Sequence, residues 1–140
     1  MLRIIPLALV LIGSTGCANH TKKWVGTWEG MDETLVSPEL AEENPVIAGT
    51  IQRVILTIKP DRTFELIRGG FPAIGNAALG EKQATLTITH LMDQPLEKLP
   101  KETQAQNQPI TITFSEGKIE LKDPTNFGKP SLTLAKKVER

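Results

Sequence analysis

Apolar and polar residues alternate with a period of two along most of the chain after residue 23. The clearest case is residues 50–68, TIQRVILTIKPDRTFELIR, where two alternating stretches flank Pro60-Asp61-Arg62. Proline and aspartate favour tight turns, and alternation on both sides of a turn is typical of a β-hairpin with one buried face. The sequence therefore predicts antiparallel strands joined by short turns.

The same alternation predicts seven strands and hence an all-β fold. They cover residues 24–29, 50–58, 63–68, 84–92, 110–115, 118–122 and 131–135. We expect a single small antiparallel up-and-down barrel or a flattened β-sandwich, with about seven or eight strands. An antiparallel meander closes only with an even number of strands. An eighth strand is therefore expected at 35–36, 46–47 or 71–74, unless the sheet stays open as a sandwich.

Three segments lack the alternation and are interpreted as loops. Residues 31–49 are acidic, and Ser37-Pro38 predicts the start of a short helix that Asn44-Pro45 would end. Residues 69–80, GGFPAIGNAALG, are glycine-rich yet apolar, and residues 93–109 read as a polar hairpin arm.

The first residues have the order of a secretory signal peptide. A positive start at residues 1–3 precedes an apolar run at 4–12 and small residues at 13–16. The apolar run is about half the length that a membrane-spanning helix needs. We therefore expect export and removal of residues 1–16.

Cys17 is the only cysteine, and it follows this segment directly. Ser14-Thr15-Gly16-Cys17 resembles the lipobox of bacterial lipoproteins. The resemblance implies cleavage before Cys17, lipidation of its thiol and a membrane anchor of two or three acyl chains such as palmitate. Ala18 then resembles an outer-membrane address, facing the periplasm, in bacteria with two membranes. The alternative is an ordinary secreted protein with an incidental cysteine.

These boundaries divide the chain into a signal peptide (1–16), a lipidated tether (17–23) and one β domain (24–140). Arg3 is the only charged residue of 1–16, so the mature chain keeps 15 basic and all 16 acidic residues. It is near neutral, and we expect no nucleic-acid partner and no field that recruits anionic lipid.

Few residues are available for catalysis. His20 and His90 are the only histidines, and the chain has neither a nucleophile elbow nor a phosphate-binding loop. Zinc would need several histidine or cysteine ligands. We expect no enzymatic activity, no metal and no cofactor.

His90 shares the predicted inner face of its strand with Leu86, Ile88 and Met92. It is either a half-buried imidazole with a hydrogen-bond partner or a polar contact inside a ligand cavity. In the second interpretation His90, Met92, Phe71 and Ile74 are the candidate ligand-binding residues.

Gly26-Thr27-Trp28 resembles the G-x-W signature that opens the first strand of lipocalins. The resemblance implies that Trp28 closes one end of a barrel beneath a basic side chain near the last strand, where Lys136, Lys137 and Arg140 are available. Gly26 would allow a bend or a close backbone approach. Plain core packing is the alternative role for Trp28.

Together these observations predict a membrane-anchored, non-enzymatic lipoprotein of the cell envelope. It is expected to act as an interaction or structural module with a protein partner, or alternatively to bind or carry a small apolar ligand. The choice depends on where Phe71, Ile74 and Leu79 point.

Overall fold

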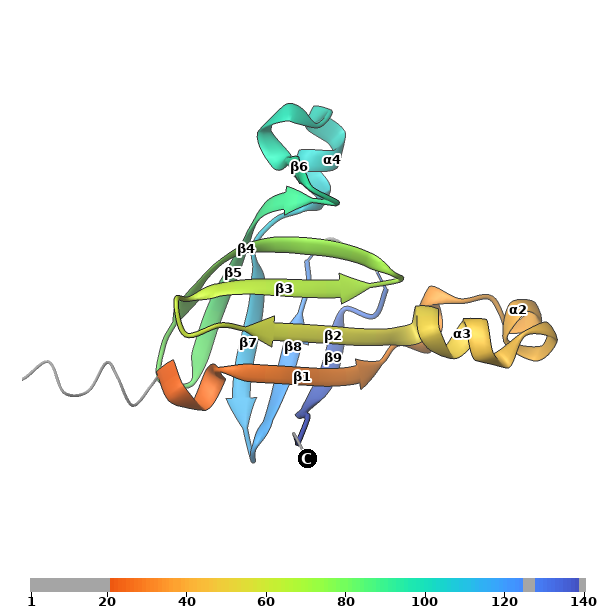
Figure 1. Cartoon of the computed structure of the whole chain (residues 1–140), viewed down its shortest axis with the longest axis horizontal. Coiled ribbons are helices and arrows are strands. Elements are labelled where there is room, and N and C mark those ends of the chain that lie inside the picture. Colours follow the sequence, from red (N-terminus) through yellow and green to blue (C-terminus); the bar gives the residue numbers. More distant parts are fainter. Residues whose placement is uncertain (1–20, 125–127, 139–140) are drawn as a thin grey trace, which may run out of the picture.

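Eight antiparallel strands close into a barrel in the computed structural model, which describes residues 21–124 and 128–138. Each barrel strand pairs with the next barrel strand along the chain, and β9 returns to pair with β1 (Figure 1). The all-β barrel prediction is confirmed. The strands are β1 (Gly26–Met31), β2 (Arg53–Ile58), β3 (Thr63–Arg68), β4 (Phe71–Leu79), β5 (Gln83–Leu91), β7 (Ile110–Ser115), β8 (Lys118–Lys122) and β9 (Ser131–Lys136), with a short extra strand β6 (Gln94–Pro95) beside β5.

The eighth barrel strand is β4, which lies within residues 69–80, the segment that the sequence predicts to be a glycine-rich loop. That interpretation is wrong for 71–79, and the alternative of a strand at 71–74 is confirmed. Between Phe71 and Leu79 the inner side of β4 carries only the small residues Ala73, Gly75 and Ala77, so the middle of the strand shows no large apolar alternation. A Cβ on Gly75 would lie 1.9 Å from the carbonyl oxygen of Thr87, so only glycine fits.

The helices between β1 and β2 follow the capping residues. Ser37 Oγ accepts from the N–H of Leu40 at the start of α2 (Pro38–Glu43), as predicted. Asn44 ends α2, and its side-chain oxygen accepts from the N–H of Ile47 to cap the next helix, α3 (Pro45–Gln52). A new helix can start here because proline is well suited to a first helical turn. The strand predicted from residue 50 therefore begins only at Arg53.

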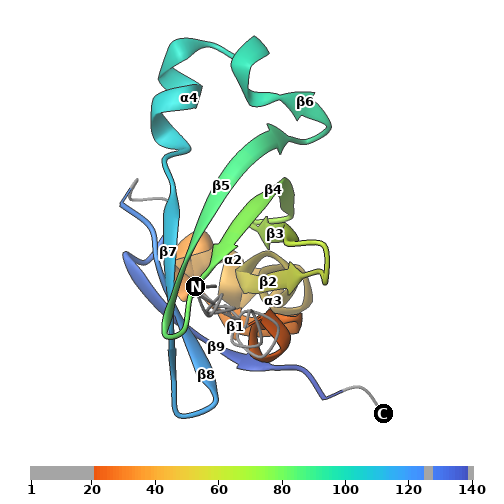
Figure 2. The same cartoon turned by 90° about the vertical axis from the view of Figure 1, so that its left-hand side faces the viewer.

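Residues 93–109 form an arm above the barrel rather than a plain hairpin. The arm contains β6, the 3₁₀ turn η2 (Leu96–Lys98) and α4 (Lys101–Gln106). It connects the end of β5 to the start of β7 and stands over one end of the barrel (Figures 1 and 2). We call this end the mouth and the opposite end the floor.

Period-two packing fills most of the barrel interior with apolar side chains. The strands turn fully buried residues inward, namely Trp28, Val54, Leu56, Ile58, Phe64, Leu66, Leu86, Ile110, Ile112, Ile119, Leu121 and Leu134. Trp24 is buried as well, but it belongs to a helical turn at 21–24 and not to the predicted strand 24–29. Burial of these side chains is the main stabilisation of a barrel of this size.

Candidate functional site

The floor of the barrel is closed by three aromatic rings. Trp28 Nε1 donates to the carbonyl oxygen of Trp24 (2.9 Å), and Trp24 Nε1 donates to that of Gly80 (2.8 Å). Phe114 meets both indoles edge-on, with ring centroids 5.7 and 6.0 Å away. The packed rings therefore fill this end of the barrel interior.

Basic side chains cover the same rings. Lys136 Nζ lies 5.6 Å from the centre of the Trp28 ring, within range of a cation–π interaction. Gly26 has φ +138°, and a Cβ there would lie 2.8 Å from Lys136 Cε. The structure thus places Gly26, Trp28 and a basic residue of the last strand as the lipocalin resemblance implies.

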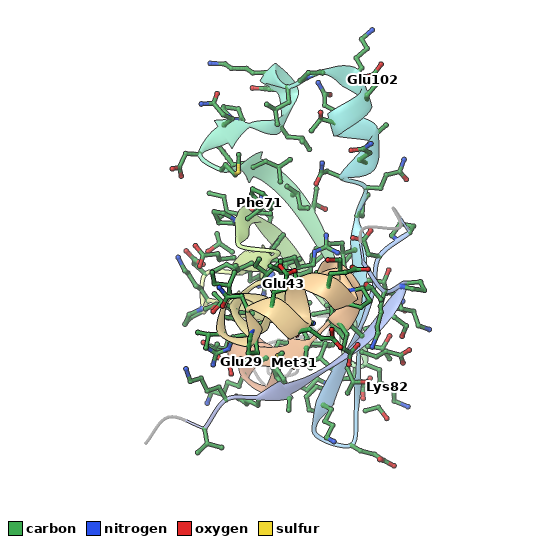
Figure 3. The ribbon with its side chains drawn as sticks, turned by 90° about the vertical axis from the view of Figure 1, so that its right-hand side faces the viewer. Glu29, Met31, Glu43, Phe71, Lys82 and Glu102 are labelled. Carbon is green, nitrogen blue, oxygen red and sulfur yellow. The ribbon has the colours of Figure 1, made fainter. Side chains whose placement is uncertain are left out.

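A cavity of about 530 Å³ lies at the mouth, between the barrel and the arm. Its barrel side comes from β3, β4 and β5, and its outer side comes from the arm. Most of the lining is apolar, with uncharged polar groups added by the arm: Leu66, Arg68, Phe71, Ala73, Ile88, Leu91, Met92, Gln94, Leu99, Thr103, Gln106 and Asn107. Figure 3 shows Phe71 at the mouth, below the arm that carries Glu102.

A β-bulge decides which residues of β5 face this cavity. Ile88 pairs with Gly75, but His90 pairs with Ile74, so Thr89 is an extra residue and the alternation shifts. Paired residues point to the same face, and Leu91 pairs with the buried Ala73. Leu91 therefore continues the inner face, and His90 does not.

The four predicted ligand residues fall on two sides of the wall. Phe71 and Met92 line the cavity and are 57% and 55% exposed, which marks its open side. His90 and Ile74 lie together on the outer face, so His90 does not share the inner face with Ile88 as the unbroken alternation predicts. His90 Nδ1 is 2.9 Å from Thr89 Oγ1, and its ring borders a second hollow under the arm. Leu79, at the floor end of β4, packs half-buried against the core.

An ion pair crosses the barrel at the level of the cavity. Arg68 Nη1 donates to Asp123 Oδ2 at 2.5 Å, and the two side chains are 12% and 1% exposed. Arg68 ends β3 and Asp123 follows β8, which lies on the opposite side of the closed sheet. Within the described residues Arg68 is the one charged side chain of the lining, and its charge is balanced by Asp123.

Sequence reasoning missed Arg68 and the contribution of the arm. Arg68 continues the two-residue period of Phe64 and Leu66, so its inward direction was readable. Leu96 and Leu99, three residues apart, were the signal that the arm has an apolar side.

Asp32, just after β1, forms hydrogen bonds that connect this part of the mouth to the segment before β9. Its carboxylate accepts from the N–H and hydroxyl of Thr34 and, at 2.8 Å, from the N–H of Lys129. Burial opposes the charge, but these hydrogen bonds outweigh it, and the pKa of Asp32 lies below its ordinary value. A Cβ on Gly128 would lie 2.3 Å from Asp32 Oδ2, so glycine is needed beside it.

The described residues hold no group of three or more His, Cys, Asp and Glu side chains placed to bind a metal ion. Across residues 21–124 and 128–138, no helix has both the length and the apolar character needed to cross a membrane.

Comparisons with known proteins add no relative. The chain matches no protein-family model, and no curated protein or solved structure is similar to it at a significant level. The function is therefore argued from the site alone.

Proposed function

We propose that this protein is a membrane-anchored barrel that binds a small amphipathic ligand at its mouth. The observation that carries the proposal is the 530 Å³ cavity, which falls in the size range of small-molecule sites. Five apolar side chains from the barrel strands, with Met92 just after β5, form its wall, while the rest of the barrel interior is filled by buried side chains. Of the two functions expected from the sequence, ligand binding is the one that this geometry favours.

The lining also indicates the class of ligand. Gln94, Thr103, Gln106 and Asn107 supply uncharged hydrogen-bonding groups on the arm side. Arg68 is already bonded to Asp123, so the cavity offers no net charge to an ionic ligand. A neutral molecule with one apolar face and one hydroxyl- or amide-bearing face fits this division.

The membrane anchor is supported by the sequence alone. The signal-like residues 1–16 and the lipobox-like Cys17 lie outside the described residues. Two or more acyl chains would hold the protein stably on a membrane, so the barrel itself needs no spanning segment. Mass spectrometry of the mature N-terminal peptide tests this part. A diacylglyceryl-modified Cys17 supports the anchor, and an unmodified Cys17 or another N-terminus contradicts it.

Ligand binding is tested with N-phenyl-1-naphthylamine, a neutral apolar probe that fluoresces when it leaves water. We expect saturable one-to-one binding to a chain that begins at Ala18, which contains every described element. Ala73→Leu adds three carbons at the cavity wall and should weaken binding at least about tenfold. Ala78→Leu makes the same change on the exposed outer side of β4 and is the matched control. Equal effects of the two variants, or no saturable binding, would contradict the proposal.

A protein partner is the second candidate, and one observation favours it. Val46 and Ile47 on α3 are 78% and 49% exposed, and Met31 at the end of β1 is 47% exposed. Photo-crosslinking from position 46 in cells should then give one discrete adduct that position 78 does not give. The same set of crosslinked adducts from positions 46 and 78 would argue against a partner at α3.

A further inference from the structure

The charged residues of the barrel are separated between its two ends. Because the strands alternate in direction, the start of β1, the turns β2–β3, β4–β5 and β7–β8, and the end of β9 all lie at the floor. Eight exposed or half-exposed basic side chains occupy these positions: Lys22, Lys23, Lys59, Arg62, Lys82, Lys118, Lys136 and Lys137. The same positions carry three acidic side chains, Asp61, Glu81 and Glu116.

The opposite end has the reverse character. Residues 31–52, which include α2 and α3, carry five acidic residues and no basic one. Figure 1 places this helical segment and the helical turn 21–24 at opposite ends of β1. The near-neutral total charge, from which the sequence predicts no field that recruits anionic lipid, therefore conceals a basic floor with an excess of five positive charges, eight basic minus three acidic.

Local ion pairs leave most of the floor's charge exposed to solvent. Lys137 Nζ lies 3.5 Å from Glu29, which also binds Arg53. Lys23 and Lys136 keep their ammonium groups over the floor rings, at 5.3 Å from Phe114 and 5.6 Å from Trp28. Lys59, Lys82 and Lys118 lie exposed at three separate turns.

We infer that the basic floor is a docking surface for an anionic lipid bilayer. The chain enters the barrel in this face at Thr21, and the step to a membrane rests on the anchor at Cys17 that is part of the proposed function. Thr21 is four positions after Cys17 in the sequence, and four residue steps span at most about 14 Å. An anchored barrel therefore has its floor close to the lipid headgroups, within range of their surface potential.

This orientation has a consequence for the proposed ligand site. A barrel that rests on its floor presents the mouth, the arm and the acidic α2–α3 segment away from the bilayer. The ligand then enters from the aqueous phase and not directly from the acyl chains.

The test uses the unlipidated chain from Ala18, so that it does not depend on the anchor. Co-sedimentation is measured with vesicles of phosphatidylcholine alone and with vesicles that contain roughly one quarter phosphatidylglycerol. We expect binding to the anionic vesicles only, because each basic residue near such a surface strengthens binding about fivefold. High salt should abolish this binding.

A pair of charge-matched variants locates the surface. Lys59→Gln/Lys82→Gln/Lys118→Gln removes three charges from the floor and should weaken binding at least about tenfold. Lys98→Gln/Lys101→Gln/Lys122→Gln removes three from the arm and mouth, and its binding should stay within about twofold. Equal losses in both variants, no preference for anionic vesicles, or binding to duplex DNA as strong as to vesicles would overturn the proposal. Failure of lipidation at Cys17 would leave these vesicle results unchanged, so the two proposals fail separately.

Discussion

Replacing Trp28 by alanine should destabilise the barrel by ~3–5 kcal/mol, the usual cost of removing a buried aromatic ring. Trp28 is 1% exposed, bonds to the Trp24 carbonyl and meets Phe114 edge-on. Its loss leaves a void at the floor and removes the hydrogen-bond partner of a buried carbonyl. A domain of this size has ~5–15 kcal/mol to lose, so the variant should lie near the limit of stable folding.

Urea unfolding followed by far-ultraviolet circular dichroism measures this cost, because removing one of only two tryptophans alters the fluorescence signal itself. Trp28→Phe keeps most of the ring and should cost ~1–2 kcal/mol through the lost hydrogen bond. Lys136→Met removes only the cation above the ring and should cost ~0.5–1 kcal/mol. If the free energy of unfolding of Trp28→Ala lies within about 1 kcal/mol of the parent's, with an unchanged slope against urea concentration, the floor does not hold the barrel closed.

Two further predictions concern the wall and the rim. Gly75→Ala should cost at least ~2 kcal/mol in the same unfolding assay, since its Cβ would collide with the Thr87 carbonyl, whereas a cost near zero would contradict the tight approach of β4 and β5. Asp32→Asn should cost ~1–3 kcal/mol at neutral pH. Because the folded pKa of Asp32 lies below its ordinary value, its stabilisation is present above the ordinary pKa and is lost as the pH falls through the lower, folded pKa. The difference between the parent and Asp32→Asn should therefore shrink below about pH 4, and a constant difference would show that charge is not the cause.

The sequence predicts the strands of the barrel correctly wherever large apolar residues alternate with polar ones. Both partners of the β2–β3 hairpin and the β7–β8 hairpin show this pattern, and the bounds of β3, β7 and β8 follow it, whereas β2 begins three residues later than predicted. Strand β4 was missed as a full strand because its inner face is built from alanine and glycine. Glycine is required at position 75 by the neighbouring Phe64 ring and the Thr87 backbone, which no local pattern can show.

The residues of the candidate site were harder to predict, because two features that shape the site leave no periodic pattern in the sequence. The bulge at Thr89 shifts the phase of β5, so His90 leaves the inner face and Leu91 enters it. The outer wall of the cavity comes from the arm, whose position over the mouth depends on tertiary contacts. Phe71 and Met92 were identified as candidates, and the structure places both at the open side of the cavity.

The central claim is that a small ligand binds between the mouth and the arm. Methyl NMR of the chain from Ala18, titrated with N-phenyl-1-naphthylamine, tests it most directly because every leucine and isoleucine reports its own surroundings. The account predicts shifts at Leu66, Leu91 and Leu99, which line the cavity, and none at Leu134, which is buried in the core and does not line it. Shifts confined to Ile47 on the exposed face of α3, or no shifts at the mouth, would contradict it.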